Sequence, residues 1–305
     1  MKHLLFVLLV AAFSQAPAAT GRIFYLDIAH GGRVLSATEA GADVTVVSPS
    51  RASGPDGIVV DPAGRRLYWT TMGAVGGNDG TIERADVDGG HAATIVPAGG
   101  TFTPKQIKLD AVHGKLYWAD REGMRIMRAN LDGSALETIV ETASGDAARR
   151  DQRNWCVGIA LDVGRGHVYW TQKGSGGNGR ILRAPITITA GQSAAARSDI
   201  EILFDGLPEP IDMDLDLSTR LMYWTDRGDA PRGNTVSRAP MDGPHRAQQI
   251  LFGGLKEGIG IALDVAHGRM FVTDLAGNVY RANLDGSDRQ TILTGQGTLT
   301  GIAVF

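Results

Sequence analysis

Hydrophobic positions along the chain gather in short aromatic segments that recur at intervals of about 44 to 54 residues. Most of these segments pair aromatic residues with a small or β-branched residue and end on a polar one, which is typical of a β-strand. The six segments lie at residues 24–27 (FYLD), 68–71 (YWTT), 117–120 (YWAD), 169–172 (YWTQ), 223–226 (YWTD) and 271–274 (FVTD). A period of this length predicts the blades of a propeller rather than independent domains.

Each aromatic segment is accompanied by three other segments in the same phase. The segment before it reads GIVVD, QIKLD, GIALD, DMDLD and GIALD in repeats two to six, and a short polar turn separates the two. A third segment follows at residues 82–85, 126–129, 181–184, 236–239 and 279–282, and a fourth is exemplified by residues 138–140 and 291–293. Four antiparallel strands per repeat predict an all-β fold, a six-bladed β-propeller.

The first repeat lacks the innermost segment that precedes the aromatic one in the other repeats. The end of the chain supplies it, because residues 301–305 (GIAVF) match that segment. We therefore expect the C-terminal strand to complete blade one and to close the ring. Closure removes the free strand edges that promote aggregation.

The N-terminus follows a different pattern. Lys2 and His3 precede an apolar run over residues 4–13, and an A-x-A cleavage pattern follows at residues 16–18. We interpret residues 1–18 as a secretory signal peptide and residues 19–305 as one propeller domain of a secreted or periplasmic protein. The run is shorter than the roughly 20 residues that span a bilayer, so no transmembrane segment is expected after cleavage. A buried first strand and an uncleaved anchor are the alternatives.

Composition narrows the function classes. The 41 glycines and 12 prolines suit a fold with many tight turns, and a formal charge of −3 gives no reason to expect nucleic acid as a partner. Cys156 is the only cysteine, so we expect a small buried hydrophobe and no internal disulfide. No histidine–cysteine cluster or metal motif predicts a cofactor or a metal site. Calcium held by carboxylates remains an alternative without a diagnostic spacing.

The repeated YWTD-like segments resemble the YWTD family, the six-bladed propellers named for the class B repeats of low-density lipoprotein receptors. The resemblance covers about residues 21–305 and implies a propeller whose face binds other proteins, without a catalytic set. The chain departs from the pattern at Thr71, at Gln172 and at Phe271-Val272. The cysteine-rich modules that flank the receptor propellers are also absent from this sequence, so receptor biology does not transfer directly.

Residue types that return in most repeats are expected to serve the scaffold. We expect them to satisfy backbone groups and to pair between neighbouring blades. They are Asp27, Asp120, Asp226 and Asp274 at the end of the aromatic segment, and Arg84, Arg128, Arg183, Arg238 and Arg281 in the third segment.

The innermost segments of repeats three and five break the pattern. Where the other repeats have small or apolar residues, repeat three has Gln106 and Lys108, and repeat five has Asp212 and Asp214 in matching register. Charges beside the central channel must be paired or shift their pKa. Lys108 and Asp214 form either a structural ion pair or part of a site. In a site, Asp212 or Asp214 would be the general base and Lys108 would stabilise a developing anion.

The loops at one rim of the channel supply the second set of candidates. Arg153, Asn154 and Trp155 stand out, because an exposed Trp beside Arg is typical of binding hot spots. Burial of Trp155 beside Cys156 is the alternative. Arg227 is a further binding candidate on this rim. Glycine-rich loops at residues 73–80, 174–179 and 228–233 are expected there too. The GxGxxG match within residues 174–179 joins two strands, so it does not predict dinucleotide binding.

Two functions from different classes remain open, and the sequence does not decide whether the protein is an enzyme. The first is an exported binding module that recognises a protein, peptide or glycan with the rim around Trp155, Arg153 and the loop of repeat five. The alternative is a small-molecule enzyme, a hydrolase, lyase or isomerase, with its site at the channel mouth. A purely structural subunit is a third possibility.

Overall fold

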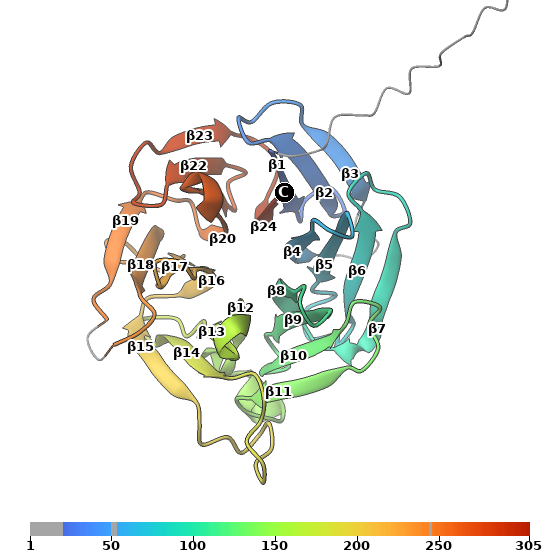
Figure 1. Cartoon of the computed structure of the whole chain (residues 1–305), viewed down its shortest axis with the longest axis vertical. Coiled ribbons are helices and arrows are strands. Elements are labelled where there is room, and N and C mark those ends of the chain that lie inside the picture. The colour runs from blue at the N-terminus through green and yellow to red at the C-terminus, as the bar shows by residue number, and fades with distance from the viewer. Residues whose placement is uncertain (1–20, 50–53, 244–245) are drawn as a thin grey trace, which may run out of the picture.

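The structure is a computed structural model that describes residues 21–49, 54–243 and 246–305. The segment 1–18, interpreted as a signal peptide, lies outside these residues. Six four-stranded antiparallel sheets stand around a central channel, and each sheet is one blade (Figure 1). The prediction of an all-β, six-bladed propeller is therefore confirmed.

In each blade the innermost strand lies at the channel, and the other three follow outward in chain order. Blade one contains β24 (Leu299–Val304), β1 (Arg22–Asp27), β2 (Arg33–Thr38) and β3 (Thr45–Pro49), and blade two contains β4 (Pro55–Asp61), β5 (Arg66–Thr71), β6 (Gly80–Asp86) and β7 (Ala93–Thr101). Blade three contains β8 (Pro104–Asp110), β9 (Lys115–Asp120), β10 (Arg125–Asn130) and β11 (Glu137–Glu141), and blade four contains β12 (Cys156–Asp162), β13 (His167–Gln172), β14 (Gly179–Pro185) and β15 (Glu201–Leu207). Blade five contains β16 (Pro210–Asp216), β17 (Leu221–Asp226), β18 (Thr235–Pro240) and β19 (Gln249–Gly253), and blade six contains β20 (Gly258–Asp264), β21 (Arg269–Asp274), β22 (Val279–Asn283) and β23 (Gln290–Leu293).

Helical structure is confined to short turns. The segment that leads into blade four contains α1 (Asp146–Arg149) and η1 (Gln152–Asn154), which the sequence pattern did not predict. In blades four and six the turn after the innermost strand is helical, as η2 (Val163–Arg165) and η3 (Val265–His267). In both turns an aspartate at the end of the strand accepts a backbone N–H three residues on, from Arg165 or His267.

The C-terminal strand closes the ring as expected. β24 pairs antiparallel with β1, and Ala303 lies opposite Phe24 in the register. The backbone N–H of Phe305 donates to the carbonyl of Arg22 at 2.8 Å, and the rings of Phe24 and Phe305 pack edge to face with centroids 6.2 Å apart. Residues from both ends of the chain therefore form blade one.

The aromatic segments form the core between blades. The tyrosines and tryptophans are almost completely removed from solvent, and they pack in clusters that combine two neighbouring blades. One such cluster joins Tyr169 of blade four to Met213 and Trp224 of blade five. Truncation of a side chain of this size typically costs about 3–5 kcal/mol, so these clusters supply much of the stability of the ring.

A buried threonine in the aromatic strand connects four of the blades to the next one. In blade two, the hydroxyl of Thr70 accepts the backbone N–H of Gly57 at 2.8 Å and donates to the carbonyl of Lys105, in blade three, at 2.7 Å. The same pair of bonds is made by the other threonines in this position, Thr171, Thr225 and Thr273. Each hydroxyl thus satisfies one backbone group in its own blade and one in the neighbouring blade.

The repeated aspartates work within a blade. Asp120 accepts the backbone N–H of Thr103 at 2.7 Å and Asp226 accepts that of Glu209 at 3.0 Å, so each carboxylate fixes the loop that leads into its own innermost strand. The prediction that these aspartates satisfy backbone groups is confirmed. The expectation that they pair between blades is wrong, because the bonds of all four stay within one blade.

Two of the repeated arginines do connect neighbouring blades. Arg183 donates to the carbonyl of Met241 at 3.4 Å, and Arg238 donates to the carbonyl of Leu284 at 2.9 Å. Arg128 and Arg281 bond instead to residues of their own blade. Of these four arginines, Arg183 and Arg238 make the expected bonds between blades, and the other two do not.

Removal of residues 299–305 should unfold the whole protein. Without β24, β1 loses its inner partner and blade one no longer joins blade six to blade two. We expect loss of the cooperative thermal transition that the full chain shows by circular dichroism. A truncated protein with the full-length midpoint would contradict the role of β24 in closure.

Replacement of Thr171 by Val should destabilise the ring without changing side-chain volume. The substitution leaves the N–H of Gly158 and the carbonyl of Ile211 without their partner, at a cost of about 1–3 kcal/mol for each buried group. Thr294→Val, at an exposed position, is the matched control. Denaturant unfolding measures both variants, and equal free energies of unfolding would refute the bridging role of Thr171.

Candidate functional site

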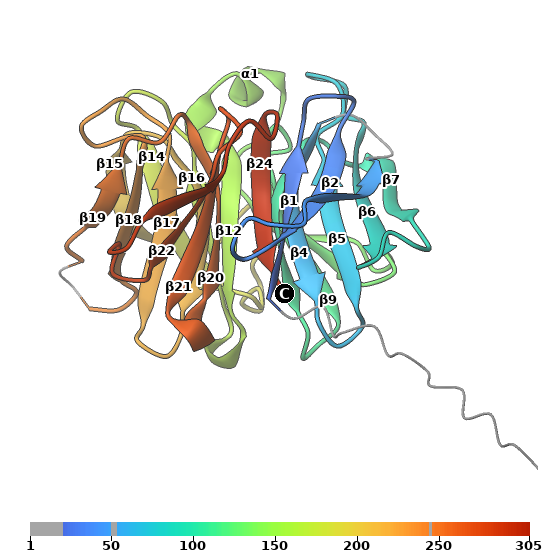
Figure 2. The ribbon, with the colours of Figure 1, turned by 90° about the horizontal axis from the view of Figure 1, so that it is seen from above.

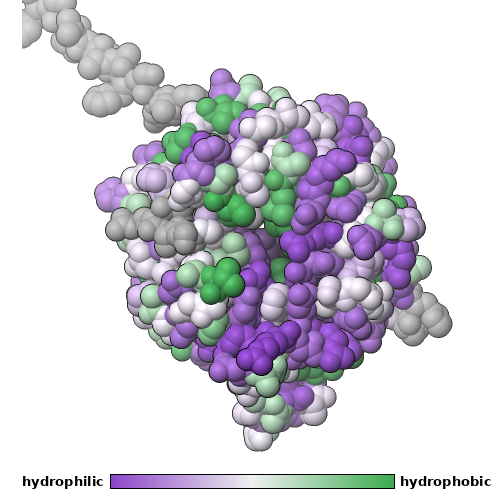
Figure 3. Space-filling view, turned by 180° about the vertical axis from the view of Figure 1, so that it is seen from behind, coloured by the Kyte–Doolittle hydropathy of each residue, from purple (hydrophilic) through white to green (hydrophobic). Residues whose placement is uncertain are grey.

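The loops that lead into the innermost strands, here named lead-in loops, lie on the same face as the loops after the aromatic strands. Three backbone hydrogen bonds connect the two sets. In each, an N–H after the aromatic strand donates to a carbonyl of the lead-in loop: Arg121 to Thr103, Lys173 to Trp155, and Arg227 to Glu209. This face also carries α1, at the top of Figure 2. Figure 3 shows the molecule from this side, with a hollow at the centre and mostly hydrophilic residues around it. The expected rim of the channel is therefore present.

Trp155 lies half-buried on this rim. Its indole N–H donates to the carbonyl of Arg149, in α1, at 2.8 Å. The guanidinium of Arg121 lies 5.0 Å from the ring centroid and the Nζ of Lys173 lies 5.5 Å from it, which are cation–π distances. The ring is thus held in place by its surroundings. It is neither fully exposed nor fully buried, so the structure lies between the two alternatives.

The neighbouring Cys156 is fully buried, as expected for a small hydrophobe. Burial raises the pKa of its thiol to about 12. The thiol is therefore protonated at neutral pH, which makes it a poor nucleophile.

Ion pairs continue from Trp155 toward blade six. Lys173 lies 3.0 Å from Glu209, and Arg227 lies 2.7 Å from the same carboxylate. Burial, together with the nearby Arg227, lowers the pKa of Lys173. We name this continuous row across blades three to five the rim ladder; it consists of Arg121, Trp155, Lys173, Glu209 and Arg227.

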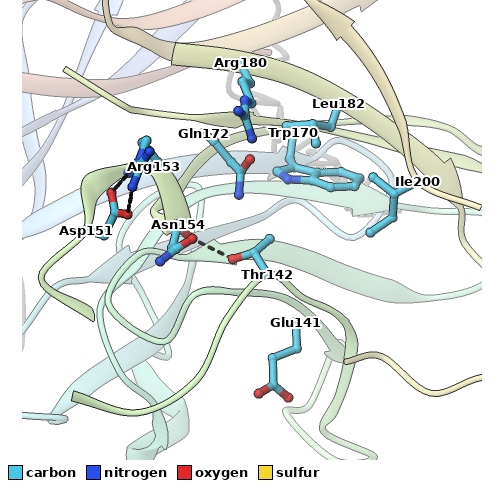
Figure 4. Close-up of a pocket in the computed structure, with 10 residues that line it drawn as sticks. All are labelled: Glu141, Thr142, Asp151, Arg153, Asn154, Trp170, Gln172, Arg180, Leu182 and Ile200. Atoms are coloured by element: carbon cyan, nitrogen blue, oxygen red, sulfur yellow. Dashed lines mark hydrogen bonds and ion pairs between the residues drawn. The ribbon is translucent and has the colours of Figure 1, made fainter. Parts of the chain in front are cut away.

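A cavity opens on either side of blade four, and residues of the rim ladder line the second of them. One, of about 330 Å³, is lined by Arg153, Asn154 and Trp170 among others (Figure 4). The other, of about 400 Å³, lies between the glycine-rich loops of blades four and five and is lined by Arg227 and Glu209. The structure thus places the predicted rim candidates Arg153 and Asn154 in one cavity and Arg227 in the other, while Trp155 belongs to the rim ladder and lines neither cavity.

Gln106 lies at the channel mouth with two residues that the sequence did not single out as site residues. Its amide donates to a carboxylate oxygen of Asp56 at 3.0 Å, and the other oxygen of Asp56 forms an ion pair with Lys105. Burial lowers the pKa of Lys105 to about 8, although Asp56 opposes the shift. Sequence alone gave no signal for this pair, because most rim charges are solvated.

Lys108 and Asp214 meet inside the channel. The Nζ of Lys108 lies 3.5 Å from Asp214 Oδ1, at a cavity of about 290 Å³ whose other walls are apolar. Their blades flank blade four, where Ala160 occupies the corresponding position. The carboxylate of Asp214 also accepts the backbone N–H groups of Leu215 and Leu263, at 3.0 and 3.1 Å.

Asp212 is buried one step further toward the rim. Its oxygens accept the N–H groups of Met213 and Ile261, at 2.8 and 3.0 Å, so it also connects blade five to blade six. Burial raises the pKa of Asp212 to about 7, although Lys108 opposes the shift. Burial alone would lower the pKa of Lys108, but Asp214 and Asp212 outweigh it and hold that pKa above its ordinary value. The channel therefore contains a charged lysine beside a carboxyl group that titrates near neutrality.

In residues 21–49, 54–243 and 246–305, no three His, Cys, Asp or Glu side chains converge in a way that could hold a metal ion. No helix in the same part of the chain is long and apolar enough to cross a membrane.

Comparisons with solved structures agree with this architecture. A chain of the nidogen/laminin complex superposes with a TM-score of 0.74 at 20% identity, covering 92% of this chain and 97% of that one. A gluconolactonase from Xanthomonas campestris superposes with a TM-score of 0.62 at 16% identity, covering 91% and 87%. Identities this low show the shared fold and nothing about activity.

Sequence comparisons find relatives of higher identity, although no family model matches the chain. The 3-hydroxyacyl-CoA dehydrogenase-like protein LAM1 of Cochliobolus heterostrophus is 40% identical over 82% of this chain, which spans only 56% of that protein. The low-density lipoprotein receptor-related protein 1 of Pyricularia oryzae is 46% identical over 288 residues, covering 90% of this chain and 92% of that protein. The chain belongs to the family of this Pyricularia oryzae protein.

Proposed function

We propose that the chain is an exported binding module that receives a protein, peptide or glycan partner on the rim ladder. The observation that carries the proposal is Trp155, an aromatic ring held half-buried beside two cations, with its neighbour Asn154 at one cavity and Glu209 at another. Tryptophan and arginine are the residue types that dominate binding hot spots. A ring that is already fixed by Arg149, Arg121 and Lys173 loses little conformational freedom when a partner binds.

The comparisons support the same proposal. The Pyricularia oryzae relative bears the name of a receptor-related protein, and the nidogen propeller comes from a complex with laminin. Export is part of the proposal and rests on the N-terminal segment 1–18.

Substitutions on the rim ladder should weaken partner binding and leave the fold intact. For Trp155→Ala we expect a loss of about 2 kcal/mol, roughly 30-fold in Kd, and for Arg227→Gln about tenfold. Glu209 keeps Lys173 as its partner in Arg227→Gln, so the melting temperature should change little. Biolayer interferometry measures binding to a partner first recovered from host culture medium by cross-linking and then purified.

Arg165→Gln is the control for this experiment. Arg165 belongs to η2, in a turn at the end of the innermost strand that lies away from the lead-in loops, and it is exposed. Its substitution should leave partner binding unchanged. If the rim variants bind as tightly as the wild type, the rim ladder is not the binding site.

A small-molecule enzyme is the second candidate, because Lys108 and Asp214 line the channel cavity and Asp212 is buried close to Lys108. In a hydrolase, lyase or isomerase, Asp212 or Asp214 would be the general base and Lys108 would stabilise an anion. A base that titrates near pH 7 suits this chemistry. Asp214→Asn and Lys108→Met would then abolish turnover without unfolding the protein.

The stability of the protein should report the titration of Asp212. A carboxyl group with a raised pKa binds its proton more tightly in the folded state. Its contribution to the free energy of unfolding is therefore complete below about pH 4 and is lost as the pH rises through about 7. The difference in free energy of unfolding between wild type and Asp212→Asn should therefore fall over this range, by at most about 4 kcal/mol. Denaturant unfolding at pH 4, 5.5, 7 and 8 measures it. A difference that does not change with pH would argue against a base of near-neutral pKa.

A further inference from the structure

Blade four lacks an arginine–aspartate pair that two other blades contain. In blade one Arg33 pairs with Asp27 at 2.6 Å, and in blade three Arg125 pairs with Asp120 at 2.8 Å. Each pair joins the end of the second strand to the facing residue of the third. In blade four the facing residues are Gln172 and Arg180. The arginine is present, but the carboxylate has been replaced by a neutral amide.

The backbone role of the missing aspartate is taken by η1. In blade three, Asp120 accepts the N–H of Thr103 in the lead-in loop. Trp155 is the matching residue of blade four, and its N–H donates to the carbonyl of Gln152 at 3.1 Å instead. The loop therefore needs no carboxylate from the blade, whereas Arg180 is left without its buried partner.

Arg180 forms only a weak ion pair in place of the missing one, although Asp151, which lines the same cavity, is a second negative charge near it. Its Nε lies 3.1 Å from Asp205, and the side chain of Asp205 is 57% exposed. Ion pairs this exposed are typically worth less than about 1 kcal/mol, so the guanidinium can exchange this partner for another at little cost.

A cavity opens beside the place of the missing carboxylate, which the side chain of Gln172 now occupies. Gln172, Arg180 and Trp170 line the cavity of about 330 Å³ in Figure 4, in which the side chain of Glu141 points away from Arg180 and Trp170. The indole N–H of Trp170 is fully buried and has no hydrogen-bond partner among the described residues.

Two other tryptophans, Trp69 and Trp224, also lack a partner for the indole N–H, whereas Trp118 donates to Thr101 at 3.1 Å. Trp170 differs from them because it lies beside an arginine without its buried carboxylate and lines this cavity. An unpaired buried donor carries a cost that an incoming acceptor would remove.

We propose that this cavity is a binding site for a carboxylate group, which takes the place of the aspartate that blade four lacks. The carboxylate accepts hydrogen bonds from the guanidinium of Arg180 and from the indole N–H of Trp170. Arg153 at the edge of the cavity is already neutralised by Asp151, at 2.6 Å, so Arg180 supplies the attraction. The assignment of this carboxylate to an Asp or Glu side chain of a protein partner rests on the proposed function.

The test uses the indole resonances of the ¹⁵N-labelled protein. The chain has five tryptophans, and loss of one signal in Trp170→Phe assigns the relevant resonance. Sodium acetate is titrated against acetamide and against sodium chloride of equal ionic strength. We expect acetate alone to move the Trp170 signal downfield in a saturable way. No saturable shift with acetate would overturn the proposal.

Two variants and one control separate the site from general salt effects. Gln172→Asp places a carboxylate beside Arg180, so it should abolish the acetate response and raise the melting temperature. Arg180→Gln should weaken acetate binding about tenfold, because a charge-assisted pair is lost. Arg165→Gln, an exposed arginine in the same blade, should leave the titration unchanged. An unaltered acetate response in both Gln172→Asp and Arg180→Gln would refute the proposed position.

A last comparison identifies the source of the carboxylate. A capped Gly-Gly-Glu-Gly-Gly peptide that binds about tenfold more tightly than glutarate supports an acidic side chain, and equal affinity supports a free small acid. The carboxylate site and the proposed function can be refuted separately. If rim variants lose their partner while acetate has no effect, the carboxylate site is wrong and the binding module stands. If acetate binds while the rim variants keep their partner, the reverse holds.

Discussion

A buried threonine hydroxyl connects the innermost strand of one blade to that of the next, and the arrangement of the channel depends on this bond. Thr171 accepts from Gly158 and donates to Ile211, so the two strands must approach closely. A Cβ on Gly158 would lie 2.2 Å from the carbonyl oxygen of Ile211, which explains glycine at this position. The ring is therefore closed by specific polar bonds between blades as well as by aromatic packing.

Fixed innermost strands also fix the loops that lead into them. Because these strands start at one face, Trp155, Glu209 and their neighbours from different blades come within ion-pair and cation–π distance of one another. Residues far apart in sequence, such as Arg121 and Arg227, thereby belong to one row. A rigid scaffold holds the rim side chains in place before any partner arrives, which reduces the entropic cost of binding.

The period of the sequence predicted the blades, the strand order and the closure by residues 301–305, because backbone pairing follows directly from regular strand spacing. It also singled out Lys108 and Asp214, since charges stand out in a column of small residues. The Lys105–Asp56 pair and α1 were missed, because they depend on how neighbouring blades and one long loop meet in space. The threonine column was visible in the sequence, but a hydroxyl that bridges two blades is recognisable only once the distance between them is known.

Blade four differs from the others in two features, Gln172 in place of the aspartate and η1 in its lead-in loop, and the two have one physical explanation. A blade that keeps its aspartate uses it to hold the lead-in loop, as Asp120 holds Thr103. In blade four the loop satisfies its own N–H groups through η1, so the aspartate is free to change to Gln172. The same loop brings Trp155 and Arg153 to the rim. Functional sites are expected where a blade departs from the repeated pattern. At Gln172 this departure leaves Arg180 and the indole N–H of Trp170 beside the same cavity.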